Sequence, residues 1–202
     1  MIVRALLQGL RVAEVPTTLS PDGRSRPPHL RTWRDGWRHL RFLLLFSPRW
    51  LFLYPGLAIL AFGAAATASL LPGPIYVVQG VTLDIHTLII GCFALLVGTQ
   101  CVCFALISRR YAAHRSFLPP ARYPAWVRSL FGLEKHLVIA GVLIALGLGG
   151  IAYSVFVWAA ADFGPLAYPA LLRPVTMSST LVALGIQVGF TAFLLELFKI
   201  DG

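Results

Sequence analysis

The run WLFLYPGLAILAFGAAATASLL, residues 50–71, decides the fold class because it contains no charged side chain. About 20 apolar residues, rising ~1.5 Å each, cross a ~30 Å hydrocarbon core as one helix. Similar runs follow at about 86–107, 137–160 and 179–198. We therefore predict an all-α membrane protein with a bundle of four transmembrane helices over residues 50–202.

The composition supports this prediction and excludes several other classes of protein. Hydrophobic residues make up 57% of the 202 residues and charged residues only 12%, whereas a soluble domain is nearer 25% charged. An ordinary soluble enzyme, a disordered tail and a secreted disulfide scaffold are excluded. The three cysteines, Cys92, Cys101 and Cys103, all lie in the second apolar run, where we expect free thiols.

The basic residues predict how the chain is oriented. Counted before, between and after the four runs, Lys and Arg number 9, 0, 6, 1 and 1, and the net charge is +9. The positive-inside rule then places both termini in the cytoplasm, and we expect a multi-pass protein of the bacterial inner membrane. The expected partner of the basic excess is anionic membrane lipid rather than nucleic acid.

Small residues recur at four-residue spacing within two of the apolar runs. Gly185 and Gly189 form one such set, and Gly141, Ala145 and Gly149 form another. Small side chains let helix backbones approach closely. The interpretation we favour for both sets is ordinary helix packing inside the four-helix bundle.

The first 28 residues differ in character from the rest of the chain. Residues 3–10 have the pattern of the end of a helix, and Arg11–Pro16, RVAEVP, has the pattern of a short strand ended by proline. Residues 17–28 follow as a loop rich in Pro, Gly, Ser and Arg. A lone helix and strand cannot fold alone, so residues 1–28 are predicted to be the remnant end of a larger αβ domain.

Residues 29–49 are predicted to form an interfacial amphipathic segment, with its helix at about 29–46. On a helical wheel at ~100° per residue, an apolar stripe lies beside a basic stripe. The side chains expected at the membrane interface are Arg31, Trp33, Arg34, Trp37, Arg38 and Arg41. Indole rings favour headgroup depth and guanidinium groups reach lipid phosphates. Packing of the Trp face on a protein domain is an equally weighted and compatible alternative.

The stretch RVAEVPTTLSPDGRSRPPHLRTWRDGWRHLRFLL, residues 11–44, resembles the C-terminal part of membrane-anchored family 2 glycosyltransferases, the polyprenyl- and dolichyl-phosphate hexose synthases. In that family a helix and an EVP strand close the catalytic domain, and a loop with a Gly-x-Ser-Lys pattern follows. Here the loop is Gly23-Arg24-Ser25-Arg26, with Arg in the Lys place. The run Arg34–Leu40, RDGWRHL, is close to a bacterial subgroup of these enzymes.

The resemblance implies a function and a site. Such enzymes move a hexose from a nucleotide sugar to a polyprenyl phosphate, so Gly23, Arg24, Ser25 and Arg26 are the expected lipid-phosphate site. Arg side chains and a Ser hydroxyl are suited to hold a phosphate, and glycine lets the backbone turn around it. Without the family, this loop is only a basic turn next to a membrane.

The resemblance also implies something that this sequence lacks. The family's nucleotide-sugar domain uses an Asp-x-Asp metal site, and these 202 residues contain no Asp-x-Asp. We therefore expect no cofactor and no catalytic residue in this chain, with Mg²⁺ or Mn²⁺ bound in a domain outside it. The chain alone is expected to be inactive, and its expected partners are polyprenyl phosphate and either a separate catalytic domain or a second copy.

Two other classes of function stay open at this point. A small four-span carrier, or a subunit that flips lipid-linked sugars, would have the same length and the same number of spans. Such a protein would not need the RVAEVP segment or the loop at 23–26, so the first 28 residues favour the transferase. A structural anchor that oligomerises is the third possibility.

Overall fold

The computed structural model describes residues 5, 9–18, 32–78, 80–114, 132–164 and 168–200. Within these ranges the chain is mainly helical, with one small hairpin. The elements in chain order are α2 (Thr32–Phe46), the π-helix η1 (Arg49–Leu53), α3 (Tyr54–Leu70), β1 (Ile75–Val78), β2 (Val81–Leu83), α4 (Ile85–His114), α6 (Leu133–Ala160) and α7 (Tyr168–Ile200).

Four helices are long and apolar enough to cross a membrane, which confirms the predicted number of spans in the described part of the chain. They cover Arg49–Leu70, Ile85–His114, Leu133–Ala160 and Leu171–Phe198. The helix expected from residue 29 begins, in the described part, at Thr32 and ends at Phe46 as expected. The larger difference is at α7, which begins at Tyr168 rather than near residue 179. Pro174 lies inside it, and transmembrane helices tolerate proline because neighbouring groups satisfy the freed carbonyl.

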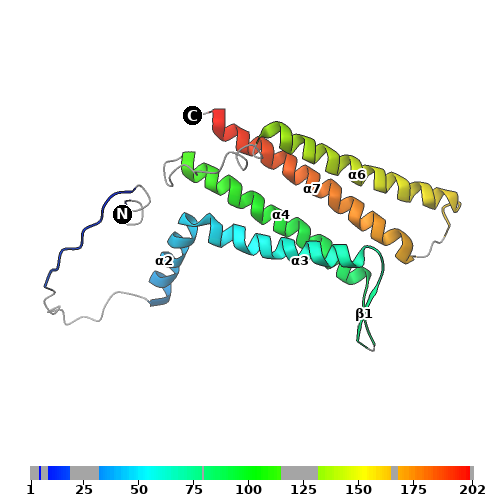
Figure 1. Cartoon of the computed structure of the whole chain (residues 1–202), viewed down its shortest axis with the longest axis horizontal. Helices are drawn as coiled ribbons and strands as arrows, with labels where there is room; N and C mark the ends of the chain where they lie inside the picture. Colours follow the sequence, from blue (N-terminus) through cyan, green and yellow to red (C-terminus); the bar gives the residue numbers. More distant parts are fainter. Residues whose placement is uncertain are drawn as a thin grey trace.

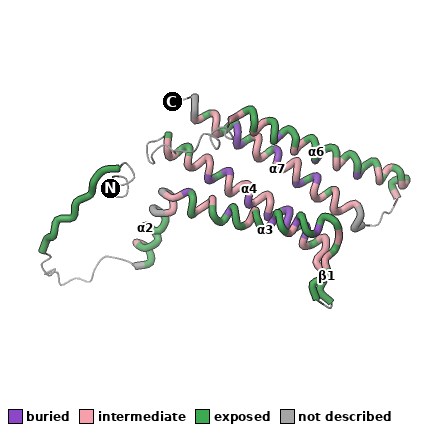
Figure 2. Tube along the Cα trace, in the orientation of Figure 1, coloured by how far each residue is buried: buried purple, intermediate pink, exposed green. Residues whose placement is uncertain are grey.

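The four spanning helices pack side by side in the order α3, α4, α7, α6 (Figure 1). The bundle is therefore open, with α3 and α6 at its two edges. Buried positions alternate with exposed ones along each helix (Figure 2). Many large apolar side chains are exposed, such as Phe62, Phe156 and Phe190, as expected for helices surrounded by lipid rather than by water.

Glycines bring the helix backbones together at the α3–α4 contact. A Cβ on Gly98 would lie 2.6 Å from the backbone nitrogen of Leu60, and one on Gly63 would lie 2.6 Å from that of Leu95. No side chain fits at such a distance, so these positions require glycine. The same close approach was not predicted from the sequence of either helix.

The α6–α7 contact confirms one of the two predicted small-residue sets and contradicts the other. A Cβ on Gly185 would meet the carbonyl oxygen of Ala140 at 2.8 Å, so Gly185 packs inside the bundle as expected. Gly141 and Gly149 have nothing within 4 Å and face outward. The expectation that they pack inside the bundle was wrong, because α7 contacts the opposite face of α6, where Ala140 and Gly147 lie.

The strand predicted at Arg11–Pro16 is not formed. Residues 10–18 are exposed and belong to no helix or strand. A strand needs a neighbour for its N–H and C=O groups, and in the described part of the chain the paired strands are β1 and β2. Ala5 is helical, which agrees with the expected helix at 3–10 at that one described position.

The hairpin β1–β2 occupies the segment that the sequence had indicated only as a loop between the first two spans. Its strands are antiparallel, with Ile75 opposite Leu83 and Tyr76 opposite Thr82. Gly80 has φ +87°, a conformation that favours glycine at the turn. Ile75 and Leu83 pack against a core of Leu70, Leu88 and Cys92. The hairpin is thus anchored at its base to α3 and α4.

Candidate functional site

The antiparallel course of the spans gives the molecule two chemically different ends. We call the first the α2 end; it comprises α2, η1, the last turns of α4 and α7 and the start of α6 (Figure 1). The second is the hairpin end, which comprises β1–β2, the start of α4, the end of α6 and the start of α7 (Figure 1). The predicted interface residues that the structure describes, Trp33, Arg34, Trp37, Arg38 and Arg41, lie at the α2 end.

A break at Ser47 and Pro48 turns α2 away from the direction of α3. The residue before a proline is disfavoured in the helical region, and Pro48 itself precedes the π-helix with φ −57°. The Ser47 carbonyl accepts hydrogen bonds from the N–H groups of Trp50 and Leu51 at 3.1 and 3.3 Å. These bonds start the next helix. As a result, α2 meets α3 at a sharp angle at one end of the spans (Figure 1).

The α2 helix is exposed along its apolar stripe. Trp33 is 92% exposed, Trp37 is 61% exposed and Leu40 is 47% exposed. In the described part of the chain α2 packs chiefly on η1, so most of its Trp face contacts no protein there. These exposures agree with both interpretations of this face, insertion into the membrane interface and packing on a domain outside these residues.

The basic stripe of α2 is exposed as well. Arg34, Arg38 and Arg41 all reach solvent. Arg38 lies 3.7 Å from Asp35 one turn earlier, with 67% of its side chain exposed. An exposed pair of this kind contributes little to stability, so these guanidinium groups can bind anionic headgroups.

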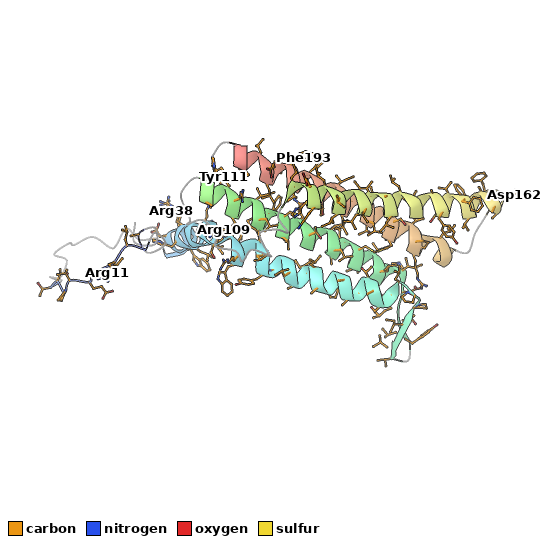
Figure 3. All side chains as sticks on the ribbon, turned by 45° about the horizontal axis from the view of Figure 1, so that its top comes forward. Arg11, Arg38, Arg109, Tyr111, Asp162 and Phe193 are labelled. Carbon is orange, nitrogen blue, oxygen red and sulfur yellow. The ribbon has the colours of Figure 1, made fainter. Side chains whose placement is uncertain are left out.

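Aromatic and basic side chains from the spans gather at the same end. The rings of Trp50 and Tyr54 meet edge to face at 4.9 Å, and those of Tyr111 and Phe198 at 5.9 Å. Arg109 and Tyr111 lie near α2 in Figure 3, far from Asp162 at the other end. Aromatic belts mark membrane–water interfaces, and cations suit the C-terminal end of α4.

The predicted phosphate loop is not among the described residues. Gly23, Arg24, Ser25 and Arg26, together with Arg31, lie outside the ranges that the structure describes. Their role in holding a lipid phosphate stays a prediction. The remaining interface residues that the sequence indicated are all described, and all of them are exposed at the α2 end.

An ion pair at the hairpin end was missed by sequence reasoning. Arg173 of α7 donates to the carboxylate of Asp84, which directly precedes α4; 17% of the Arg173 side chain and 39% of the Asp84 side chain are exposed. In the sequence, Arg173 is only the one basic residue between the third and fourth apolar runs, and Asp84 carries no prediction. The Arg-Pro step at 173–174 has the appearance of a loop, and no local signal in the sequence pairs it with Asp84.

The side chains that could bind a metal are scattered among the described residues. No cluster of three or more His, Cys, Asp or Glu side chains that could hold a metal is found among them. Cys92, Cys101 and Cys103 are free, which confirms the prediction for the thiols.

Comparison with known proteins gives a match in the membrane-spanning part of the chain. Residues 106–199 match the family described as glycosyltransferase family 2 C-terminal transmembrane region. These residues are similar to the C-terminal transmembrane region of family 2 glycosyltransferases. The matched range takes in the end of α4 and most of α6 and α7.

A curated relative extends the similarity to almost the whole chain. It is the low-salt glycan biosynthesis hexosyltransferase Agl6 of Haloferax volcanii, 31% identical over 196 residues. The alignment covers 96% of this chain and 45% of the relative, so the chain spans less than half the length of Agl6. No solved structure matches the chain.

Proposed function

We propose that this glycosyltransferase family 2 region anchors a transferase in the membrane and forms the side that receives the lipid-phosphate acceptor. The reaction is transfer of a hexose from a nucleotide sugar to polyprenyl phosphate. The observation that carries the proposal is α2, which lies at one end of the spans with its Trp and Arg side chains exposed. The similarity to Agl6, a hexosyltransferase, supports the sugar class.

The α2 end supplies what an acceptor lipid requires. A polyprenyl phosphate has an apolar chain that stays among lipid tails and a charged headgroup at the interface. Exposed indole rings of α2 suit the boundary, and exposed guanidinium groups suit the phosphate. Both types of side chain on one helix can therefore hold the phosphate of the acceptor at a fixed depth.

The loop at 23–26 is proposed to complete the phosphate site. Five residues separate Arg26 from Thr32, and a chain covers at most ~3.3–3.6 Å per residue, so the two lie within roughly 20 Å. Arg24 and Arg26 are thus tethered near the α2 end whatever path the chain takes. Ser25 adds a hydroxyl donor, and Gly23 adds freedom for the backbone to approach a phosphate.

We also propose that the α2 end faces the cytoplasm, in a cytoplasmic membrane, because most of the Lys and Arg residues lie on that side of the spans. The hairpin end then faces outward. A tag inserted at Gly80, in the hairpin turn, should be reached only from the outside of intact cells. Labelling of that tag from the cytoplasmic side would contradict the orientation.

Photocrosslinking to the 202-residue chain in liposomes tests the proposal. A photoreactive polyprenyl phosphate should label the protein, and unlabelled polyprenyl phosphate should compete. Polyprenol, which lacks the phosphate, should compete poorly. Equal competition by both lipids would contradict a phosphate site and leave only a lipid-facing surface.

The same preparation tests where the sugar chemistry takes place. We propose that Mg²⁺ or Mn²⁺ and the nucleotide sugar bind in a catalytic domain outside these residues. The 202-residue chain should therefore bind the acceptor but transfer no radiolabelled sugar to it, with or without either metal. Clear transfer by this chain would require a catalytic site among its own residues.

A further inference from the structure

The β1–β2 hairpin exposes several large apolar side chains among its described residues. Residues 71–83 contain no charged side chain. Beyond the base of the hairpin the exposed fractions are 79% for Tyr76, 56% for Val77, 68% for Val78 and 52% for Val81. Large apolar side chains gathered on a short exposed segment mark a surface that another apolar phase covers.

Both faces of the hairpin have this character. Successive residues of a strand point to opposite faces, so the consecutive exposed residues Tyr76, Val77 and Val78 place apolar side chains on both. An antiparallel pair in water usually keeps one polar face, and an isolated two-stranded hairpin is marginally stable there. Water on both faces is therefore an unfavourable environment for this segment.

The position of the hairpin indicates which apolar phase is available. Its base packs on Leu70 and Leu88, at the ends of two membrane-spanning helices. The hairpin projects away from the row of helices on the α3 side (Figures 1 and 3), and its tip is exposed (Figure 2). The chain enters the hairpin directly from α3, on which Phe62 is exposed, through Leu71, which is exposed as well.

We propose that the β1–β2 hairpin is a membrane-interface anchor, with neutral lipid of the leaflet at the hairpin end as its partner. Its valines lie among the upper acyl chains, and Tyr76 and Thr82 lie near the headgroups. The open edges of the two strands carry unpaired N–H and C=O groups, which are too costly to bury in the hydrocarbon core. The interface satisfies those groups and covers the apolar side chains at the same time.

This anchor goes beyond the proposed sugar transfer and does not depend on it. The main competing occupant is a second copy of the chain, which could pair strand to strand along an open edge. The lack of charge and the direct connection to α3 favour lipid. The experiment below separates the two.

The test uses an environment-sensitive fluorophore on the 202-residue chain in phosphatidylcholine liposomes. Val78→Cys carries the probe in the hairpin, and Asp162→Cys carries it at an exposed position of the same end. Both sites are exposed, so neither change disturbs the core. The unsubstituted chain, treated alike, corrects for labelling of the three native cysteines.

The anchor predicts that the probe at position 78 is quenched several-fold more by nitroxide-bearing lipid than the probe at 162. It also predicts weaker quenching at 78 by a water-soluble quencher, at every lipid-to-protein ratio. Equal quenching by the aqueous agent at both positions would overturn the proposal. Protection at 78 that disappears as lipid dilutes the protein would also overturn it, in favour of a second copy.

Discussion

At the α2 end the chain surrounds the helix termini with arginine and aromatic side chains, whereas residues 71–83 at the hairpin end carry no charge. The spans between these ends are apolar along their length and pack through small residues. The spans alone therefore distinguish neither end from the other. In the functions proposed above, orientation, contact with acceptor lipid and position in the bilayer depend on the short elements at the termini of the helices.

The comparison assumes that tight packing of α3 on α4 fixes the positions of the two ends relative to each other. The largest predicted effect tests this packing. Gly98→Leu should lower the free energy of unfolding by about 3 kcal/mol or more, because its Cβ would lie 2.6–2.7 Å from backbone atoms of Leu60. Gly149→Leu is the matched control, since Gly149 has nothing within 4 Å. Unfolding of both variants in detergent measures the difference, and equal losses would contradict the packing of α3 on α4.

The next effect should appear only at the α2 end. The double change Arg24→Ala and Arg26→Ala should weaken acceptor binding about tenfold or more, because hydrogen bonds to charged groups contribute about 1.5–3 kcal/mol each. The control is Arg115→Ala with Arg122→Ala, which removes the same charge from the segment between α4 and α6. Competition photocrosslinking measures acceptor binding by both double variants. An equal loss in the control would mean that net charge, and not the loop at 23–26, causes the effect.

A smaller effect should appear only at the hairpin end. Arg173→Met leaves the Asp84 carboxylate without its partner and should cost about 1–2 kcal/mol, less than a fully buried pair because of the exposure of both groups. Adding Asp84→Asn should restore part of this loss. Thermal unfolding of the single and double variants measures the coupling, while acceptor binding should not change. Loss of acceptor binding without loss of stability would contradict the division between the two ends.

The smallest effect concerns the depth of α2. Lipid-borne quenchers should place Trp33 and Trp37 near the headgroups, as judged from the difference between the parent chain and its Trp33→Phe, Trp37→Phe variant. Arg34→Gln with Arg38→Gln should shift that depth only in anionic vesicles, since each Arg contributes about 1 kcal/mol there. Neutral vesicles are the control. Both rings at the bilayer centre would contradict an interfacial helix.

Much of the fold was predictable because hydropathy and helical periodicity are local signals. The apolar run from Trp50 and the alternating stripes around Trp33 and Arg34 predicted α3 and α2 correctly. The start of α7 could not be placed, because Arg173-Pro174 has the local chemistry of a loop. The ion pair between Arg173 and Asp84 is a tertiary contact that no local pattern reports. The strand expected at Arg11–Pro16 has local strand character but no partner strand in the described residues.

Packing faces were predicted less well, for a physical reason. Gly141 and Gly185 occur in similar small-residue patterns, yet only Gly185 meets another helix closely. Which face of a transmembrane helix is buried depends on the order α3, α4, α7, α6, and an all-apolar helix carries no periodicity that reports it. At the candidate site the described Trp and Arg residues of α2 share one helix, as the sequence predicted. Their place at the membrane interface and the role of the loop at 23–26 stay predictions.

Mapping the residues that photoreactive polyprenyl phosphate labels tests the central claim most directly, because the two ends of the molecule give different peptides. We predict phosphate-dependent labelling within residues 9–46, at the α2 end, and none within residues 72–84 at the hairpin end. An excess of unlabelled polyprenyl phosphate should abolish this labelling, and an excess of polyprenol should leave it unchanged. Phosphate-dependent labelling concentrated in residues 72–84 would contradict the account.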